Sequence, residues 1–122
     1  MTDKKTVLAI DDNVQQLDEY KNMLSANYDL RLVKSAAEAI IFLNRGTADI
    51  ILLDIEMPNI SGFTFLEDIK AIPGYSDVPI IIVSGNSGAE FLERAKNSRA
   101  SDVLIKPVKQ ETLINTIERD FI

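Results

Sequence analysis

Residues 50–58 read Ile-Ile-Leu-Leu-Asp-Ile-Glu-Met-Pro and are the most informative segment for the architecture of the chain. Four consecutive apolar residues rich in Ile suit a strand that is buried on both faces, as in a parallel sheet. Similar short runs occur at Val7–Ile10, Ile80–Val83 and Val103–Ile105. Residues 30–32, Leu-Arg-Leu, alternate instead and predict an edge strand with one wetter face.

Helical patterns separate these runs. Ser35 and Glu38 form a capping box, Gly46 stands at the C-cap position of the same pattern, and Pro73-Gly74 ends the next one. Side chains at helical spacing mark five stripes, in which Lys21 is the weak member. The stripes are Val14, Leu17, Lys21 and Leu24; Ala39, Ile40 and Leu43; Phe63, Leu66, Ile69 and Lys70; Ala89, Leu92, Ala95 and Lys96; and Leu113, Ile114, Ile117 and Phe121.

Strands and helices therefore alternate in the order βαβαβαβαβα. This alternation predicts an α/β fold: a doubly wound, five-stranded parallel sheet with helices on both faces and right-handed crossovers. With 122 residues, we assign one domain to residues 1–122. In such sheets, ligands bind beyond the carboxyl ends of the strands, so the residues that follow each strand carry the functional information.

Composition excludes several classes of protein. The net charge of −6 argues against direct nucleic-acid binding, which depends on phosphate neutralisation by Lys and Arg. The absence of Cys and His excludes disulfides, Cys/His zinc sites, thiol nucleophiles and Ser-His-Asp triads. No apolar run is long enough to span a membrane, and the first run is too short for a signal peptide. We therefore expect a cytoplasmic protein without membrane association.

Polar side chains follow four of the predicted strands: Asp11-Asp12, Asp54, Ser84 and Lys106. Each has an ordinary structural explanation on its own, such as a helix cap for the acidic pair or a turn for Asp54. Parallel strands bring all four groups to one edge of the sheet, and this coincidence favours a functional pocket. Oxygen ligands of this kind suit Mg²⁺, Mn²⁺ or Ca²⁺.

Over essentially its whole length, the chain resembles the receiver domain of bacterial two-component response regulators, the chemotaxis regulators included. Asp11-Asp12 looks like the acidic metal-binding pair of the family, and Asp54 to Pro58 with Gly62 looks like its phosphoacceptor segment. Ser84 stands at the Thr or Ser position, and Lys106-Pro107 matches a Lys-Pro whose peptide bond is typically cis. The resemblance implies a flavodoxin-like fold with strand order 2-1-3-4-5.

The resemblance also implies a function, that of a phosphoacceptor switch in a two-component phosphorelay rather than an enzyme. Asp54 would receive a phosphoryl group from a sensor histidine kinase or a histidine phosphotransfer protein. Mg²⁺, or alternatively Mn²⁺, would be held by Asp11, Asp12, Asp54 and the backbone carbonyl of Glu56, with Asp11 acting mostly through water. The resemblance gives Lys106 and Ser84 contacts with the phosphoryl oxygens.

The residues around the predicted nucleophile have further expected roles. Pro58 and Gly62 are expected to shape the loop, and Met57 is expected to pack beneath it. Glu56 and Asn86 flank the site at positions which, by the resemblance, control access of the hydrolytic water.

The chain departs from the family pattern at three positions: Val103 replaces a frequent aromatic residue, Gly85 a frequent Ala, and Arg99 a frequent Gly. Val103 has no ring that turns inward on phosphorylation. We therefore expect Ser84 to pull the flexible loop 84–88, and the helix near residues 89–96 to follow. The partner surface would combine that helix, the strand at 103–105 and the last helix.

Two alternatives remain open from the sequence. A haloacid-dehalogenase-type phosphatase also places a nucleophilic Asp after a strand with an acid/base two residues later, where Glu56 stands. The DxDx[TV] pattern and a cap domain are absent, however. A pseudo-receiver would keep only the fold, although all the predicted site residues are present. The chain is either a stand-alone receiver or a domain of a longer regulator, and the sequence leaves its output open.

Overall fold

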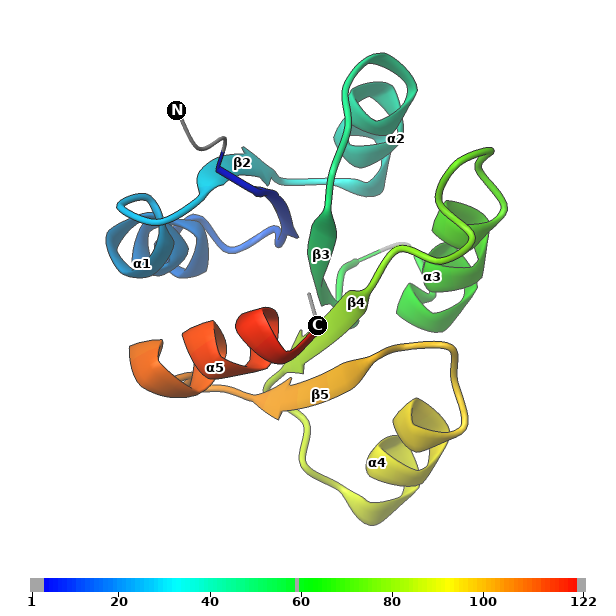
Figure 1. Ribbon diagram of the computed structural model, residues 1–122. Coiled ribbons are helices and arrows are strands. Elements are labelled where there is room, and N and C mark those ends of the chain that lie inside the picture. Colours follow the sequence, from blue (N-terminus) through cyan, green and yellow to red (C-terminus); the bar gives the residue numbers. More distant parts are fainter. Residues whose placement is uncertain (1–3, 59, 121–122) are drawn as a thin grey trace.

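The structure, a computed structural model, describes residues 4–58 and 60–120. In this part of the chain, five strands alternate with five helices, as predicted (Figure 1). The strands are β1 (Thr6–Ile10), β2 (Asp29–Val33), β3 (Ile50–Asp54), β4 (Ile80–Ser84) and β5 (Asp102–Ile105). The helices are α1 (Val14–Leu24), α2 (Ala36–Arg45), α3 (Gly62–Lys70), α4 (Ala89–Lys96) and α5 (Gln110–Asp120).

The strands form one parallel sheet in the order β2-β1-β3-β4-β5, which confirms the predicted order. The register pairs Ile10 with Leu53 and Asp54 with Val83, so β1, β3 and β4 end close together. Ser84 in turn pairs with Ile105 on β5. The polar residues that end or follow these strands therefore meet at one edge of the sheet.

Helices cover both faces of the sheet. Helices α1 and α5 lie on one face, and α2, α3 and α4 lie on the other (Figure 1). Alternate residues of each central strand face the two layers, because side chains along a strand point to opposite sides. In β1, Val7 and Ala9 pack with α1 and α5, whereas Leu8 and Ile10 pack with the other layer. Two apolar cores therefore pack the sheet on both faces.

The central strands β1, β3 and β4 are buried almost completely, which explains their continuous apolar sequences. Strand β2 is an edge strand with Arg31 exposed, as its alternation predicted. Strand β5 was expected to be buried on both faces, and this was wrong. It is the other edge strand, and all of its residues are only half-buried because no strand covers its outer side.

Some residues that the sequence placed on the apolar faces of the helices are not buried in the structure. In α1, Leu17, Tyr20 and Leu24 are buried, while Val14 and Lys21 are exposed, because the helix turns its Tyr20 side to the sheet. Six other stripe residues are not fully buried either: Ile40, Phe63 and Ile114 are half-buried, and Ala89, Leu92 and Lys96 are exposed. Phe121 lies outside the described residues. No helix in residues 4–58 and 60–120 combines the length and apolar character that a membrane span needs.

The residues directly after β3 lie close to the start of α3. Met57 is buried in the core, as predicted, and Pro58 is exposed. Gly62 begins α3 directly against Ile55: a Cβ on Gly62 would overlap the Ile55 carbonyl oxygen and lie 2.6 Å from its Cα. A backbone neighbour cannot rotate away, so the close approach of these two segments requires glycine.

Gly62→Ala should therefore destabilise the protein by about 3 kcal/mol, an overpacking cost that exceeds the helix propensity gained from alanine. The free energy of unfolding in urea measures this loss. Gly85→Ala is the matched control, because no atom lies within 4 Å of a Cβ built there. Equal stabilities of the two variants would show that the Ile55 contact is not restrictive.

Candidate functional site

The candidate site lies beyond the carboxyl ends of β1, β3, β4 and β5. The carboxylate of Asp11 is fully buried and accepts the N–H of Asn13 at 2.9 Å. Asp54, the last residue of β3, is 5% exposed and accepts the N–H of Glu56 at 3.0 Å through Oδ1. Both carboxylates are held in place by the backbone that follows their strands, so their orientation is fixed before any ligand binds.

Lys106 follows β5 and extends across the sheet edge to these two acids. Its Nζ lies 3.0 Å from Asp11 Oδ2 and 3.6 Å from Asp54 Oδ2. The Lys106-Pro107 peptide bond is cis, as the resemblance implied, and the Lys106 N–H donates to the Ser84 carbonyl at 2.8 Å. Lys106 therefore belongs to the site through its backbone as well as its ammonium group.

Asp12 completes a cluster of three carboxylates. One oxygen each from Asp11, Asp12 and Asp54 lie within 4.8 Å of one another, and Asp12 is exposed to solvent while the other two are buried. Three carboxylates that converge at this spacing, open on one side, are ligands that suit a hard divalent cation such as Mg²⁺. The residues present therefore fit the metal that the resemblance implied.

The electrostatics of the cluster leave an excess of negative charge. Burial raises the pKa of Asp54 to about 6, and the negative charge of Asp11 adds to this effect. The Glu56 N–H and the Lys106 ammonium oppose the increase. Burial lowers the pKa of Lys106, but its hydrogen bond to Asp11 and the charge of Asp54 outweigh burial and raise it overall. One ammonium group thus compensates two buried carboxylates only in part.

Ser84 ends β4 at the same edge and is fully buried. Its hydroxyl donates to Glu56 Oε1 at 2.7 Å and accepts the N–H of Asn86 at 3.0 Å. The Asn86 side chain in turn accepts the N–H of Gly88, the N-cap residue of α4, at 2.8 Å. A continuous chain of hydrogen bonds therefore runs from Glu56 through Ser84 to the start of α4.

All the predicted site residues meet at this edge, but sequence reasoning missed two features. The Glu56 side chain was expected only to flank the site, whereas it holds the Ser84 hydroxyl directly. Tyr20 was not identified, yet it lies under the acids: burial raises its pKa, and the charges of Asp11 and Asp54 add to the shift. The spacing of Tyr20 from Leu17, three residues along the same helical face, was the signal available in the sequence.

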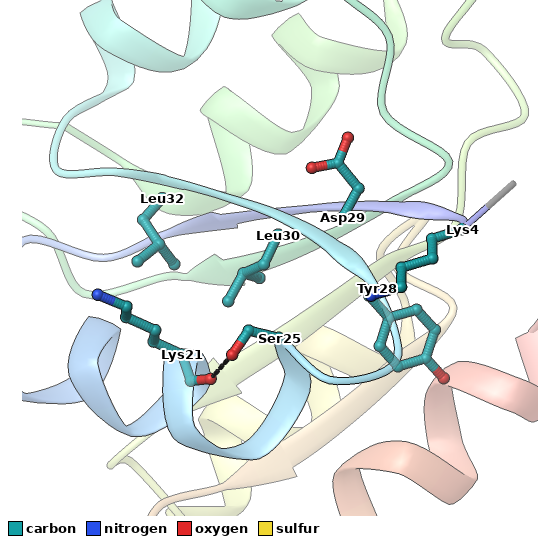
Figure 2. A pocket seen from close by; sticks show the side chains of 7 residues that line it. All are labelled: Lys4, Lys21, Ser25, Tyr28, Asp29, Leu30 and Leu32. Atoms are coloured by element: carbon teal, nitrogen blue, oxygen red, sulfur yellow. Dashed lines mark hydrogen bonds between the residues drawn. The ribbon is translucent and has the colours of Figure 1, made fainter.

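A separate hollow of about 500 Å³ lies beside the edge strand β2, away from the acidic cluster (Figure 2). Leu30 and Leu32 of β2 face Lys21 of α1 across it, and Lys4 and Tyr28 lie at its other end. None of the predicted site residues lines this hollow. A second hollow, of about 380 Å³, does reach the acidic cluster, because Asp12 lines it together with Met57 and Pro58.

Comparison with known proteins identifies the class. Residues 7–118 match the response regulator receiver domain family, so the chain belongs to that family of two-component signalling switches. The two-component response regulator ORR21 of Oryza sativa subsp. indica is 35% identical over 112 residues, which are 89% of this chain and 16% of that protein. The chain thus spans about a sixth of the length of this curated relative.

Two solved structures agree with the assignment. The chemotaxis response regulator CheY4 of Vibrio cholerae is 27% identical, with a TM-score of 0.87 over 96% of this chain and 98% of that one. The receiver domain of sensor histidine kinase PA1611 from Pseudomonas aeruginosa PAO1 is 26% identical, with a TM-score of 0.85 over 95% and 96% of the two chains. The latter structure contains a magnesium ion coordinated in the active-site cleft.

The raised pKa of Asp54 predicts a pH dependence of stability in metal-free protein. Because the folded pKa of about 6 exceeds the unfolded value near 3.8, the native state binds more protons between these limits. Stability should therefore fall as the pH rises from about 4 to 6, with a contribution from Asp54 of up to about 3 kcal/mol. Asp54→Asn should remove this contribution and be more stable than wild type at pH 7.

Urea unfolding in EDTA, at pH 4.5 and pH 7, measures this effect. The wild type minus variant difference cancels the titration of the other carboxylates. If both proteins lose the same free energy between the two pH values, the Asp54 carboxyl is not destabilised by its surroundings.

Proposed function

We propose that Asp54 is the residue of this chain that receives the phosphoryl group and that Asp11, Asp12, Ser84 and Lys106 assist the transfer. The observation that carries the proposal is the position of the Asp54 carboxylate: it is buried at the end of the central strand, within 3.6 Å of an ammonium group and inside an acidic cluster. A carboxylate deprived of water and anchored by one backbone N–H is a preorganised nucleophile.

The transfer is an in-line displacement. An Asp54 carboxylate oxygen forms a bond to phosphorus while the P–N bond of a phosphohistidine breaks, and the electron pair returns to the imidazole nitrogen. The negative charge on the phosphoryl oxygens lies next to Lys106, which is already held by Asp11 in the same pocket. Positioning and charge stabilisation provide most of the catalysis in such reactions, and both are supplied here by groups fixed to strand ends.

The proposed metal ligands are the side chains of Asp11, Asp12 and Asp54 and the backbone carbonyl of Glu56. When bound, Mg²⁺ neutralises phosphoryl oxygens and part of the charge on the acids. Support comes from the convergent carboxylate oxygens and from the magnesium ion in the receiver domain of PA1611. Mn²⁺ satisfies the same oxygen ligands and is the alternative ion.

The proposed partners follow from the family. A sensor histidine kinase or a histidine phosphotransfer protein donates the phosphoryl group, and a downstream protein or output domain binds the surface of α4, β5 and α5. In this proposal, the chain catalyses its own phosphorylation and dephosphorylation and acts as a switch in the cytoplasm. Its net charge of −6 makes a protein a better direct partner than a nucleic acid.

Acetyl phosphate with Mg²⁺ should add one phosphoryl group to the wild-type protein and none to Asp54→Asn, as measured by intact-protein mass spectrometry. Stoichiometric labelling supports a receiver, whereas steady turnover of a phosphomonoester would support the phosphatase alternative. An unlabelled wild-type protein, or equal labelling of the variant, would contradict the proposal.

Mg²⁺ should raise the melting temperature of the wild type, because a ligand that binds only the native state stabilises it by linkage. Asp12→Ala should raise the stability of the metal-free protein by about 1 kcal/mol, since like charges 4 Å apart repel by roughly that amount in water. The same variant should lose most of the Mg²⁺ response. Thermal unfolding with EDTA and with Mg²⁺ measures both effects.

Asp18→Ala is the matched control, because it removes an exposed aspartate from α1, outside the acidic cluster. It should keep the full Mg²⁺ response. If Asp12→Ala and wild type respond equally to Mg²⁺, Asp12 is not a ligand.

A further inference from the structure

We infer that the Glu56 carboxylate is a positioning residue that competes with the phosphoryl group for the single proton of the Ser84 hydroxyl, and so sets how readily the switch leaves its resting conformation. This inference rests on the proposed function and concerns the regulation of the same site. It follows from a contact that the mechanism above does not use, the 2.7 Å hydrogen bond from Ser84 Oγ to Glu56 Oε1.

The competition arises because a serine hydroxyl can donate only one hydrogen bond at a time. Here its proton is donated to Glu56. Ser84 is fully buried and its carbonyl is held by the Lys106 N–H, so the backbone stays in place while the side chain can rotate. Donation to a phosphoryl oxygen on Asp54 therefore requires the bond to Glu56 to break.

The exchange is finely balanced because both acceptors are anionic. Hydrogen bonds to charged oxygens are stronger than neutral ones, so the resting bond offsets much of what the phosphoryl bond contributes. The Glu56 side chain is exposed and can return to water once released. Its carboxylate thus raises the threshold for switching without blocking it.

The consequence extends beyond the hydroxyl. Ser84 Oγ also accepts the Asn86 N–H, and Asn86 Oδ1 accepts the Gly88 N–H. Rotation of the Ser84 side chain away from Glu56 removes the acceptor of the Asn86 N–H and loosens the loop that leads into α4. Glu56 therefore stabilises both the hydroxyl and the resting loop.

The test is a double-mutant cycle on the Mg²⁺-dependent binding of beryllofluoride, a mimic of the phosphoryl group. Glu56→Ala should lower the half-saturating beryllofluoride concentration about tenfold, the effect expected for loss of one charge-assisted competitor. In the Ser84→Ala background, the same substitution should change binding by less than about twofold, because the hydroxyl through which Glu56 acts is gone.

Two further variants separate hydrogen bonding from charge. Glu56→Asp keeps the charge but withdraws the carboxylate by one methylene, so it should bind the mimic as tightly as Glu56→Ala. Glu56→Gln keeps an acceptor oxygen at the same place and should lie between wild type and Glu56→Ala. Glu67→Ala removes an exposed glutamate on α3 and should bind as wild type does.

Amide exchange gives a second readout, because charge repulsion between Glu56 and the mimic would not alter the protection of the loop in the free protein. Without the mimic, Glu56→Ala should lower protection in residues 84–88 and leave β5 around Val103 unaffected. If Glu56→Ala has the same effect on mimic binding in the wild-type and Ser84→Ala backgrounds, or if Glu56→Asp behaves as wild type, the carboxylate acts by charge alone and the inference is wrong. A wild type that binds no mimic would instead overturn the proposed function itself.

Discussion

One ammonium group determines the character of this site. Lys106 Nζ lies between two almost completely buried carboxylates, those of Asp11 and Asp54, and can neutralise only one unit of their charge. Burial of an incompletely paired charge costs folding free energy, and the raised pKa of Asp54, due first to burial and then to Asp11, expresses that cost. A cation bound at the cluster would relieve this excess, so the predicted loss of stability without metal and the proposed binding of a cation have the same physical origin.

The packing of the sheet offsets the free-energy cost of burying these carboxylates. Strands β1, β3 and β4 are buried on both faces by two apolar cores, and their parallel register brings the strand ends together without contributions from flexible loops. The apolar body supplies the stability that the acids cost, and it fixes the carboxylates rather than letting them separate. Fixed, partly compensated charge is the condition for electrostatic preorganisation.

The sequence predicted those parts of the molecule that depend on period and chain order. Continuous Ile and Val runs identified the central strands, and the strand-end acids, Ser84 and Lys106 were placed together because parallel topology leaves no other arrangement. The predictions that were wrong concerned features that depend on tertiary surroundings. Residues 103–105 are as apolar as a central strand but lie at an edge of the sheet, and the buried face of α1 carries Tyr20 rather than the expected Lys21. The Glu56–Ser84 bond was unpredictable because a side-chain rotamer, rather than a pattern, creates it.

The way in which α4 is packed bears on how a conformational change at the acidic cluster could reach the surface. Helix α4 buries only Ala95, and its N-cap residue, Gly88, has no side chain to cap the helix. Its aromatic contacts are with Phe63 of α3: the Phe91 ring centroid lies 5.9 Å from that of Phe63, and the Arg94 guanidinium lies over the Phe63 ring. Few buried contacts oppose a shift of α4, so a small rearrangement of the preceding loop is enough to displace the helix. Val103 is β-branched and half-buried, so its side chain has restricted χ1 rotation and no ring to move between exposed and buried positions. Under the proposed function, we therefore expect a signal from the acidic cluster to pass through Ser84 and its loop to α4 rather than through the Val103 side chain.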